Sequence, residues 1–348
     1  MSETIPWRAP YAGQPVSGTV AVPGSKSLTA RALVLAALSS GPSMVHNALR
    51  SRDTLLMAEA LRSLGCAVDS GGASWQVAPA LDHGEAYVDC GLSGTVMRFV
   101  PPVACLRSGM TRFDGDPHAR TRPMGPLLDG LRQCGAHIDD GGRGLLPLTV
   151  AGSGGLRGGD VAIDASGSSQ FVSGLLLSAA RFDDGIRLRP TGAVPNRAHI
   201  AMTLEALREH GVDADEYGDG WRVAPGQIAP VDTVIEPDAS NSAPFLAAAA
   251  MTGGTVTIPH WPADSAQPIG RLLEVLAEYG ADVERTSEAI TVTGRERRGI
   301  DVDLADIGDM TPAIAAIQLT LIELCVIVRL GRRLYQKPSL PCSLTVWR

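Results

Sequence analysis

A segment that recurs four times, about 70 residues apart, constrains the fold of this chain more than any other feature. Its copies read ALRSLGCAV at 60–68, GLRQCGAHI at 130–138, ALREHGVDA at 206–214 and VLAEYGADV at 275–283. Each copy is typical of an amphipathic helix that ends at a glycine with left-handed backbone and then turns into a short strand. These glycines are Gly65, Gly135, Gly211 and Gly280. Such a period indicates a fold built from repeated structural units.

Two further patterns accompany the repeat. Each copy continues through a turn into a second strand-like run, and these runs read SWQVAP, LPLTVAG, GWRVAPG and AITVTG. In another phase of the repeat, five short polar loops each precede a helix rich in apolar residues, as in PGSKSLTARALVLAAL and DASGSSQFVSGLLLSAA. Helices that are apolar on every side belong inside a protein. We therefore expect an α/β fold in which sheets and amphipathic helices surround buried helices.

The five polar loops lie at predicted helix starts, where unpaired N–H groups and the helix dipole favour anions. Ser, Asp and Thr are also ordinary N-cap residues, so one such loop has no functional meaning by itself. Five loops in the same phase of the repeat favour a shared anion site.

Charge and cysteine content exclude several classes of protein. The 348 residues carry a formal net charge of −7, whereas binding to nucleic acid or to an anionic membrane calls for an extended basic face. The six cysteines form no C-x-x-C pair and have no histidine at metal-ligand spacing, so we predict neither a metal site nor disulfides. Because the N-terminal stretch has no apolar signal region, we expect a cytoplasmic protein without nucleic-acid or membrane partners.

The last 32 residues differ in composition from the rest of the chain. Residues 317–348 contain no alanine, although alanine is frequent before them. The stretch is apolar enough to suggest a membrane segment, but Gln318 and Glu323 interrupt it, and an acid in mid-membrane costs about 2.5–3.5 kcal/mol. We expect residues 318–348 to form an aberrant or disordered tail.

Lys26 stands out because it is one of only two lysines among the 30 Lys and Arg residues of the chain. Its loop is not a Walker A phosphate loop, since Ser25 rather than glycine precedes the lysine. Lys26, Ser27 and Arg31 nonetheless bring an ammonium, a hydroxyl and a guanidinium to one helix start. The alternative is that Lys26 is a solvated loop charge.

Two loops in the following repeat carry candidate anion contacts. Gly94 lies at a helix start in GLSGTVMRF, where a missing side chain lets a ligand approach the backbone, although a tight turn also explains it. Arg120 and Arg122 precede a helix with proline in its first turn. They are either two exposed arginines or a clamp for a carboxylate or phosphate.

Two later loops complete the candidate set. DASGSSQF presents Ser168, Ser169 and Gln170 as hydroxyl and amide donors. Asp309 in IGDMTPAIAAI lies before a predicted helix, where it either caps the helix or takes a proton from a substrate hydroxyl.

The motifs PGSKSLTARALVLAAL, CGLSGTVMRF, RTRPMGPLLDGL and IDASGSSQFVSGLLLSAA resemble those of the 3-phosphoshikimate 1-carboxyvinyltransferase family, the EPSP synthases, from Pro15 to Ile317. The resemblance implies the enolpyruvyl transferase fold: two domains, each of three βαβαββ units around buried helices, with the active site in the cleft between them. We expect residues 1–20 to belong with the second domain, 21–236 to form the first domain, and 237–317 to form an incomplete second domain.

The resemblance also implies the reaction, in which the enolpyruvyl group of phosphoenolpyruvate moves to the 5-hydroxyl of shikimate 3-phosphate through a tetrahedral intermediate, without an organic cofactor or an obligatory metal. We expect a monomer whose partners are these two small molecules. The residues that would bind shikimate 3-phosphate are Lys26, Ser27, Arg31, Ser168, Ser169, Gln170, Asn196 and Asp309. Within this set, Ser27 and Arg31 would hold the carboxylate, and Ser168 and Ser169 the phosphate.

The same resemblance assigns the phosphoenolpyruvate contacts and the catalytic groups. Lys26, Gly94, Arg122 and Gln170 match the phosphoenolpyruvate contacts. Asp309 matches the proton acceptor that activates the 5-hydroxyl, and Lys26 would assist proton transfer. The chain departs from the family pattern at Ala30, where the family usually has Asn, and at Asn196, where Ser is common.

The larger departure lies beyond residue 317, where the ETDR and DHR segments of the family and a late lysine do not occur. Charge-assisted hydrogen bonds contribute about 1.5–3 kcal/mol each, so their loss predicts very weak activity or none. One alternative is therefore a non-catalytic, shortened protein that binds only shikimate 3-phosphate. A transferase acting on UDP-N-acetylglucosamine is less favoured, because the aligned loop TRFDGDPHARTRPMG lacks the cysteine of that family. An RNA-processing enzyme on a related repeat fold is disfavoured by the acidic charge.

Overall fold

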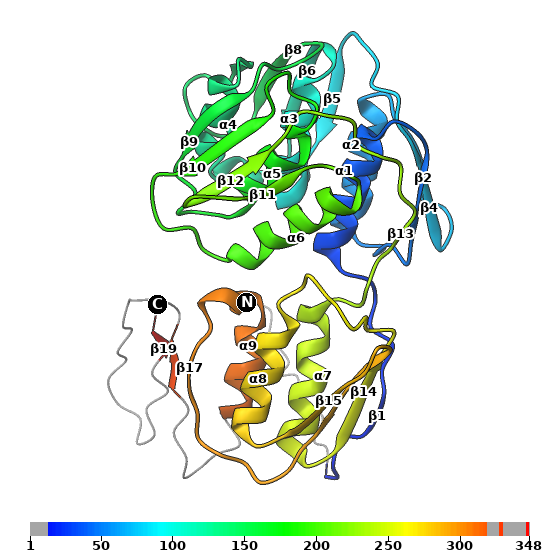
Figure 1. Ribbon diagram of the computed structural model, residues 1–348, viewed down its shortest axis with the longest axis vertical. Helices are drawn as coiled ribbons and strands as arrows, with labels where there is room; N and C mark the ends of the chain where they lie inside the picture. The colour runs from blue at the N-terminus through cyan, green and yellow to red at the C-terminus, as the bar shows by residue number, and fades with distance from the viewer. Residues whose placement is uncertain (1–12, 319–326, 330–345, 348) are drawn as a thin grey trace, which may run out of the picture. The chain divides into compact units, whose positions relative to one another are not determined.

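The computed structural model describes residues 13–318, 327–329 and 346–347, and the backbone of this part of the chain contains five sheets (Figure 1). The described residues divide into two compact units. The larger unit is Pro23–Asp238, and the smaller unit takes its residues from Met1–Val22 and Ala239–Arg348. Most of the expected tail, 318–348, lies outside the described residues, as do residues 1–12 of the expected N-terminal segment.

Three sheets of four strands belong to the larger unit. Their strand orders are β13-β2-β4-β3, β5-β6-β8-β7 and β11-β12-β10-β9. The strands are β2 (Ser43–His46), β3 (Ala67–Asp69), β4 (Ser74–Ala78), β5 (Ala86–Asp89), β6 (Ser108–Asp114), β7 (His137–Asp139), β8 (Leu148–Ser153), β9 (Gly159–Ile163), β10 (Ile186–Pro190), β11 (Ala214–Tyr217), β12 (Gly220–Val223) and β13 (Thr233–Val234).

All three sheets follow one pattern. The first two strands pair in parallel, as β5 does with β6 and β9 with β10, and the last two form an antiparallel hairpin, as β7 does with β8. In the second and third sheets, one helix connects the first strand to the second and another connects the second strand to the hairpin. In the first sheet only the second of these connections is present, because a helix joins β2 to the hairpin of β3 and β4. The predicted sequence of helix, strand, turn and strand is therefore confirmed, and it belongs to βαβαββ units.

The first sheet of the larger unit is completed by a strand from the far end of that unit. β13 pairs in parallel with β2, although about 190 residues separate them. In the smaller unit, β1 (Gly18–Thr19) likewise pairs in parallel with a distant strand, β14 (Thr255–Pro259). Because β1 precedes the larger unit in sequence and β14 follows it, the chain forms the first sheet of the smaller unit from both sides of the larger unit.

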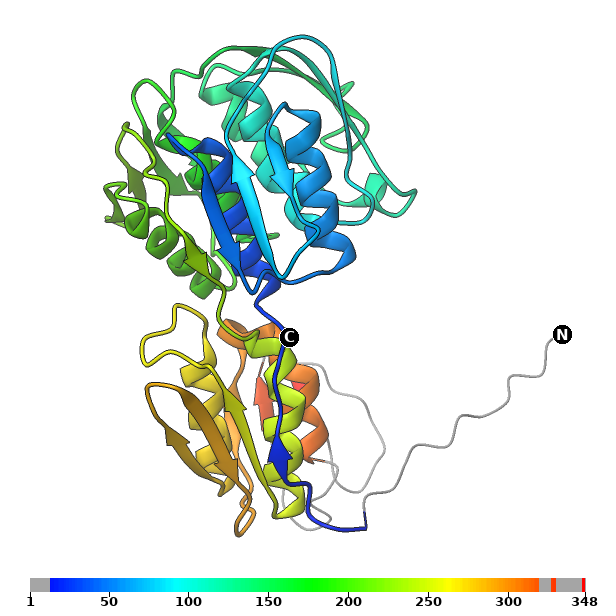
Figure 2. The same ribbon diagram turned by 90° about the vertical axis from the view of Figure 1, so that its right-hand side faces the viewer.

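Six helices of the larger unit form an inner and an outer set (Figures 1 and 2). The inner helices α1, α3 and α5 contact one another, and nearly all their side chains are buried. Their outer neighbours α2, α4 and α6 bury one face only. The bounds are α1 (Lys26–Leu38), α2 (Arg52–Ser63), α3 (Gly94–Cys105), α4 (Gly125–Gln133), α5 (Gln170–Ala179) and α6 (Arg197–Glu209). The prediction of buried apolar helices inside sheets and amphipathic helices is confirmed.

The smaller unit repeats this plan around α7 (Ala239–Thr252), which packs on α8 (Ile269–Tyr279) and α9 (Thr311–Gln318). One sheet has the order β1-β14-β16-β15, with β15 (Asp282–Arg285) and β16 (Ala289–Thr293) as its hairpin. A second sheet joins β17 (Asp301–Asp303), β18 (Ile327–Arg329) and β19 (Val346–Trp347) in parallel. The core of this unit contains Trp261 and Tyr279.

The four repeat glycines all have the expected positive φ. The angle is 105° at Gly65, 96° at Gly135, 75° at Gly211 and 111° at Gly280. Each therefore ends its helix in the region of backbone space that favours glycine. Among the described residues, no helix is long and apolar enough to cross a membrane.

Candidate active site

The three inner helices of the larger unit begin at the loops that the sequence singles out. Ser25 and Ser93 are N-caps whose Oγ atoms accept the N–H groups of Leu28 and Val96, each at 3.4 Å. Ser169 precedes α5 without such a bond, and it is buried. Ser168 Oγ instead accepts the N–H of Gln170 at 3.2 Å. The first two serines thus cap their helices in the ordinary way, whereas the hydroxyl of Ser169 has no capping role.

Gly94, Arg122 and Gln170 come together from three separate segments. Gly94 is the first residue of α3, Gln170 is the first residue of α5, and Arg122 follows the short 3-10 helix η1 (Ala119–Thr121). A Cβ atom on Gly94 would lie 2.8 Å from Arg122 Nη2 and 3.1 Å from Gln170 Oε1. A larger residue at this position would therefore displace the ends of these two side chains. A positive φ does not account for the glycine, because its φ is not in that region.

The two arginines of the ARTRP segment behave differently. Arg120 donates from Nε and Nη2 to the two carboxylate oxygens of Asp114, at 2.8 and 2.9 Å. This bidentate pair holds the pKa of Asp114 below its usual range. Arg122 instead donates from Nη1 to the carbonyl of Leu92 at 3.0 Å. Only Arg122 is thus placed as a candidate ligand contact, while Arg120 fastens its own loop.

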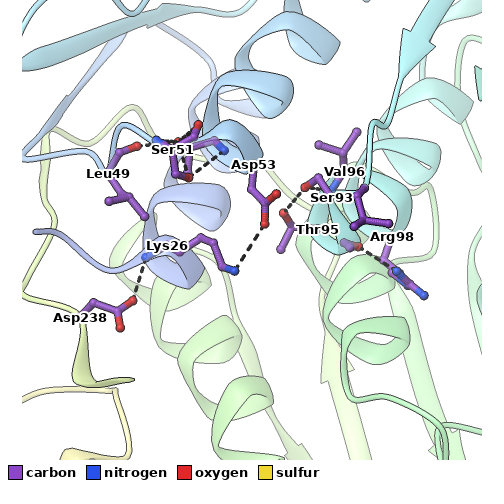
Figure 3. Close-up of polar contacts among 12 residues, drawn as sticks. Lys26, Leu49, Ser51, Asp53, Ser93, Thr95, Val96, Arg98 and Asp238 are labelled. Carbon is purple, nitrogen blue, oxygen red and sulfur yellow. Dashed lines mark hydrogen bonds and ion pairs between the residues drawn. The ribbon is translucent and has the colours of Figure 1, made fainter. Parts of the chain in front are cut away.

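Lys26, the first residue of α1, extends its ammonium toward Asp53, with Nζ 3.4 Å from Oδ2 (Figure 3). Its backbone N–H donates to Asp238 Oδ2 at 3.1 Å. About half of the Lys26 side chain, 49%, is exposed. Asp53 is a candidate functional residue that the sequence analysis missed, since it lies in the first turn of a helix with a capping box, where an acid is expected for structural reasons alone.

Arg31 is almost completely enclosed, with 1% of its surface exposed. Its Nη1 donates to the carbonyl of Ser27 at 2.9 Å, so these two predicted carboxylate contacts do lie together. The guanidinium also lies over the ring of Phe99, 5.4 Å from its centroid. Burial lowers the pKa of Arg31 to about 10. A buried guanidinium of this kind lowers the stability of the folded protein unless an anionic or polar group compensates its charge.

Arg98 on α3 is a second buried cation near the same helix starts, and the sequence analysis did not single it out. Its Nη2 donates to the carbonyl of Pro123 at 3.0 Å and its Nη1 to that of Gly94 at 3.4 Å. Burial and the nearby Arg122 lower the pKa of Arg98 to about 10. Arg98 thus connects the turn that contains Gly94 to the residue after Arg122.

The remaining predicted residues lie at other helix starts. Asn196 is the N-cap of α6, half-buried, with φ of 50° and no capping bond from its side chain. Asp309 is exposed and lies in the 3-10 helix η2 (Ala305–Met310), two residues before α9 in the smaller unit. The structure therefore brings together two sets within the larger unit, Gly94 with Arg122 and Gln170, and Arg31 with Ser27.

The electrostatic character of these helix starts is cationic. Within the described part of the chain, no carboxylate lies within ion-pairing distance of Arg31, Arg98 or Arg122. Across the same residues, no group of three or more His, Cys, Asp or Glu side chains could hold a metal ion. Cations without anionic partners next to helix N-termini form a site suited to small anions such as phosphates and carboxylates.

Comparison with known proteins gives consistent findings. Residues 10–332 match the model of a family described as EPSP synthase (3-phosphoshikimate 1-carboxyvinyltransferase), and this match continues past Ile317, where we expected the resemblance to end. A 3-phosphoshikimate 1-carboxyvinyltransferase of Kocuria rhizophila is 54% identical over 328 residues, which cover 89% of this chain and 73% of the relative. One of Mycobacterium ulcerans is 51% identical over 325 residues, which cover 91% and 75%.

Solved structures share the fold. An EPSP synthase of Acinetobacter baumannii superimposes with a TM-score of 0.76 at 22% identity, over 88% of this chain and 72% of the other. The enolpyruvyl transferase NikO of Streptomyces tendae has a TM-score of 0.67 at 18% identity, over 88% and 73%. The expected enolpyruvyl transferase fold is thereby confirmed.

Proposed function

The chain belongs to the EPSP synthase family, the 3-phosphoshikimate 1-carboxyvinyltransferases, and we propose that it transfers the enolpyruvyl group of phosphoenolpyruvate to the 5-hydroxyl of shikimate 3-phosphate. The reaction releases phosphate and is a step of aromatic amino acid biosynthesis. The observation that carries the proposal is the meeting of Gly94, Arg122 and Gln170 beside the buried Arg98, which has no carboxylate partner among the described residues. Both substrates are small polyanions, which such a site suits.

Shikimate 3-phosphate binds at the starts of α1, α5 and α6 in this proposal. Ser27 and Arg31 hold its carboxylate, which supplies the negative charge that the buried guanidinium lacks. Ser168 and Ser169 hold its phosphate at the start of α5, where the dipole favours an anion. Asn196 adds an amide donor to the phosphate from the start of α6.

Phosphoenolpyruvate binds against Gly94, between Arg122 and Lys26. The absence of a side chain at Gly94 leaves the space that the Arg122 guanidinium and the Gln170 amide occupy. Gln170 contacts both substrates from the first turn of α5. Lys26 exchanges its partner Asp53 for the incoming anion, since a half-exposed pair at 3.4 Å contributes little energy by itself.

The proposed chemistry is addition followed by elimination. Asp309 takes the proton of the 5-hydroxyl while the oxygen attacks C2 of phosphoenolpyruvate, and the methylene carbon gains a proton in a transfer assisted by Lys26. The tetrahedral intermediate then loses phosphate from C2 and a proton from the methyl group, which restores the double bond. No atom changes oxidation state overall, so acids, bases and anion contacts are the groups that this chemistry needs.

Calorimetric titration with shikimate 3-phosphate, followed by an assay of phosphate release with phosphoenolpyruvate, tests the proposal. We expect saturable binding and weak turnover, with Lys26→Ala abolishing binding and Asp309→Asn retaining binding while losing turnover. Binding without turnover in the unmodified chain supports the alternative of a shortened, non-catalytic protein. Absence of binding contradicts the proposal altogether.

Location and assembly belong to the same proposal. We place the enzyme in the cytoplasm as a monomer. The four cysteines that the structure describes, Cys66, Cys90, Cys105 and Cys134, are unpaired thiols, which agrees with a reducing compartment.

A further inference from the structure

The guanidinium of Arg31 is held by neutral groups from three helices. Its Nε donates to Thr203 Oγ1 on α6 at 2.8 Å. Its Nη2 donates to the carbonyl of His199 on α6 at 2.7 Å and to Ser173 Oγ on α5 at 3.4 Å. Its Nη1 donates to the carbonyl of Ser27 on α1 at 2.9 Å. A guanidinium has five N–H groups, so these bonds leave one N–H, on Nη1 next to Ser27.

Thr203 and Ser173 are themselves linked. Thr203 Oγ1 lies 3.0 Å from Ser173 Oγ and 3.0 Å from the carbonyl of His199, and both side chains are completely buried. Two hydroxyls on different helices therefore fix the Nε and Nη2 side of the guanidinium plane. Rotation of Arg31 away from this plane would leave buried polar groups unpaired, which costs about 1–3 kcal/mol for each group.

This fixed plane decides where the remaining N–H is directed. Because the guanidinium is planar and its Nε and Nη2 groups are bound to the protein, only the side that carries Nη1 is left for a ligand. Ser27, half-buried at the start of α1, lies at that edge. A carboxylate there would receive a charge-assisted hydrogen bond from Nη1 and one from the Ser27 hydroxyl.

We propose that Thr203 and Ser173 are positioning residues, which hold Arg31 so that its last N–H is presented to the substrate carboxylate beside Ser27. The inference rests on the proposed function, in which Arg31 and Ser27 bind this carboxylate. Neither hydroxyl touches the substrate. Each acts through the orientation of Arg31.

The test compares shikimate 3-phosphate with an analogue in which a neutral carboxamide replaces the carboxylate and the phosphate is kept. Both are titrated calorimetrically into the full chain. In the unmodified protein the carboxylate ligand should bind about 10- to 100-fold more tightly, as expected for one charge-assisted contact. In Thr203→Val, which keeps the shape of the side chain and removes its acceptor, this ratio should fall below about threefold. Thr203→Ser keeps the acceptor and should restore the ratio.

Ser173→Ala should lower the ratio by about threefold, since it removes the longest of the four bonds. Its matched control is Ser178→Ala, because Ser178 is also completely buried on α5 and its Oγ has no hydrogen-bond partner in the described structure. Ser178→Ala should leave the ratio unchanged. If Thr203→Val does not melt cooperatively, the comparison of Ser173→Ala with Ser178→Ala decides the question.

The outcomes separate the inference from the proposed function. A ratio in Thr203→Val equal to that of the unmodified chain overturns the positioning role, as does an equal loss of affinity for both ligands, which indicates a structural role only. If the unmodified chain binds the carboxylate ligand and the carboxamide analogue equally well, Arg31 does not bind the carboxylate, and the inference is overturned as well. Lack of any binding overturns the proposed function itself.

Discussion

At the scale of single residues, Gly94 shows how a side chain can be excluded by its neighbours when the backbone conformation is ordinary. The residue begins α3 in the same way that Gly125 begins α4. A Cβ atom at Gly125 would meet its nearest neighbour, Gly144 Cα, at 3.8 Å, which is a normal contact. At Gly94 the same atom would press on the Arg122 guanidinium. The two glycines therefore form a matched pair.

We expect Gly94→Ala to raise the KM for phosphoenolpyruvate at least about tenfold, because Arg122 and Gln170 must move away from their present positions. Affinity for shikimate 3-phosphate should change by less than about threefold. Gly125→Ala, the control, should leave both values unchanged. Steady-state kinetics and calorimetry measure these quantities, and equal effects of the two substitutions would show that Gly94 has no special relation to the substrate.

Arg120 and Arg122 provide a second matched pair, two residues apart. Arg122→Gln should lower kcat/KM for phosphoenolpyruvate at least about 100-fold with an unchanged melting temperature, because its guanidinium has no carboxylate partner among the described residues. Arg120→Gln should lower the melting temperature and leave turnover within about threefold, since it removes only the pair with Asp114. If Arg120→Gln lowers kcat/KM and Arg122→Gln lowers only the melting temperature, then Arg120 is the substrate contact and Arg122 the structural residue.

At the scale of elements, each repeat of the larger unit carries the same arginine contact. The arginine three residues before the cap glycine reaches forward to a backbone carbonyl of the following strand region. These bonds join Arg62 Nε to Val68 O at 2.8 Å, Arg132 Nη2 to Ile138 O at 3.2 Å and Arg208 Nε to Ala214 O at 2.7 Å. Each bond fastens the end of an outer helix to its hairpin. The copy in the smaller unit has Ala277 in this position and lacks the contact.

The cap glycines of two repeats differ in their surroundings although their φ angles, 105° at Gly65 and 96° at Gly135, are similar. A Cβ atom on Gly65 would collide with the carbonyl of Ala80 and lie 2.7 Å from Asp82 N, whereas one on Gly135 would have no neighbour within 4 Å.

Gly135→Ala should therefore lower the free energy of unfolding by roughly 1–2 kcal/mol, the cost of positive φ for a residue with a side chain. Gly65→Ala should lower it by roughly 1–3 kcal/mol more, because backbone atoms must also move. Urea unfolding measures both values. Equal losses would mean that backbone conformation accounts for the whole effect.

At the scale of the whole molecule, the chain starts in the smaller unit, passes through the whole larger unit and returns to the smaller one. The chain crosses between the units at Val22–Pro23 and again at Asp238–Ala239. Just inside the larger unit the two crossing segments pair with each other, since Gly24 forms a bridge with Pro237 and Ser25 N donates to Glu236 O at 2.9 Å. Lys26 follows directly on this pairing, so the candidate site begins where the chain enters the larger unit.

Acid should destabilise the molecule in two ranges of pH. Burial lowers the pKa of His210, whose Nδ1 is bonded to Ala206 O while its buried Nε2 has no hydrogen-bond partner among the described residues. The pKa of Asp114 is held low by Arg120, and that of Asp140 is also low, because the Gly144 N–H and Arg132 outweigh the effect of burial. In each case the unfolded chain binds the proton more readily, so the stability is present above the unfolded pKa and is lost as the pH falls.

The free energy of unfolding should first decline below about pH 6.5, through His210, and again below about pH 4, through the aspartates. Each group contributes at most about 1.4 kcal/mol per pH unit within its range. Urea unfolding between pH 8 and pH 3 measures the profile. His210→Phe should remove the upper decline and keep the lower one, and an unchanged upper decline would assign it to another group.

The repeat period, the helix ends, the hairpins and the family of this protein follow from the sequence by itself. Each depends on a pattern within a short stretch, such as the glycine that ends a helix or the serine that begins one. The tertiary structure alone decided that Lys26 faces Asp53 and that Arg31 is fixed by Thr203, which is 172 residues away in the chain. No local pattern encodes these contacts, because their partners lie on different helices and are selected by how the helices pack.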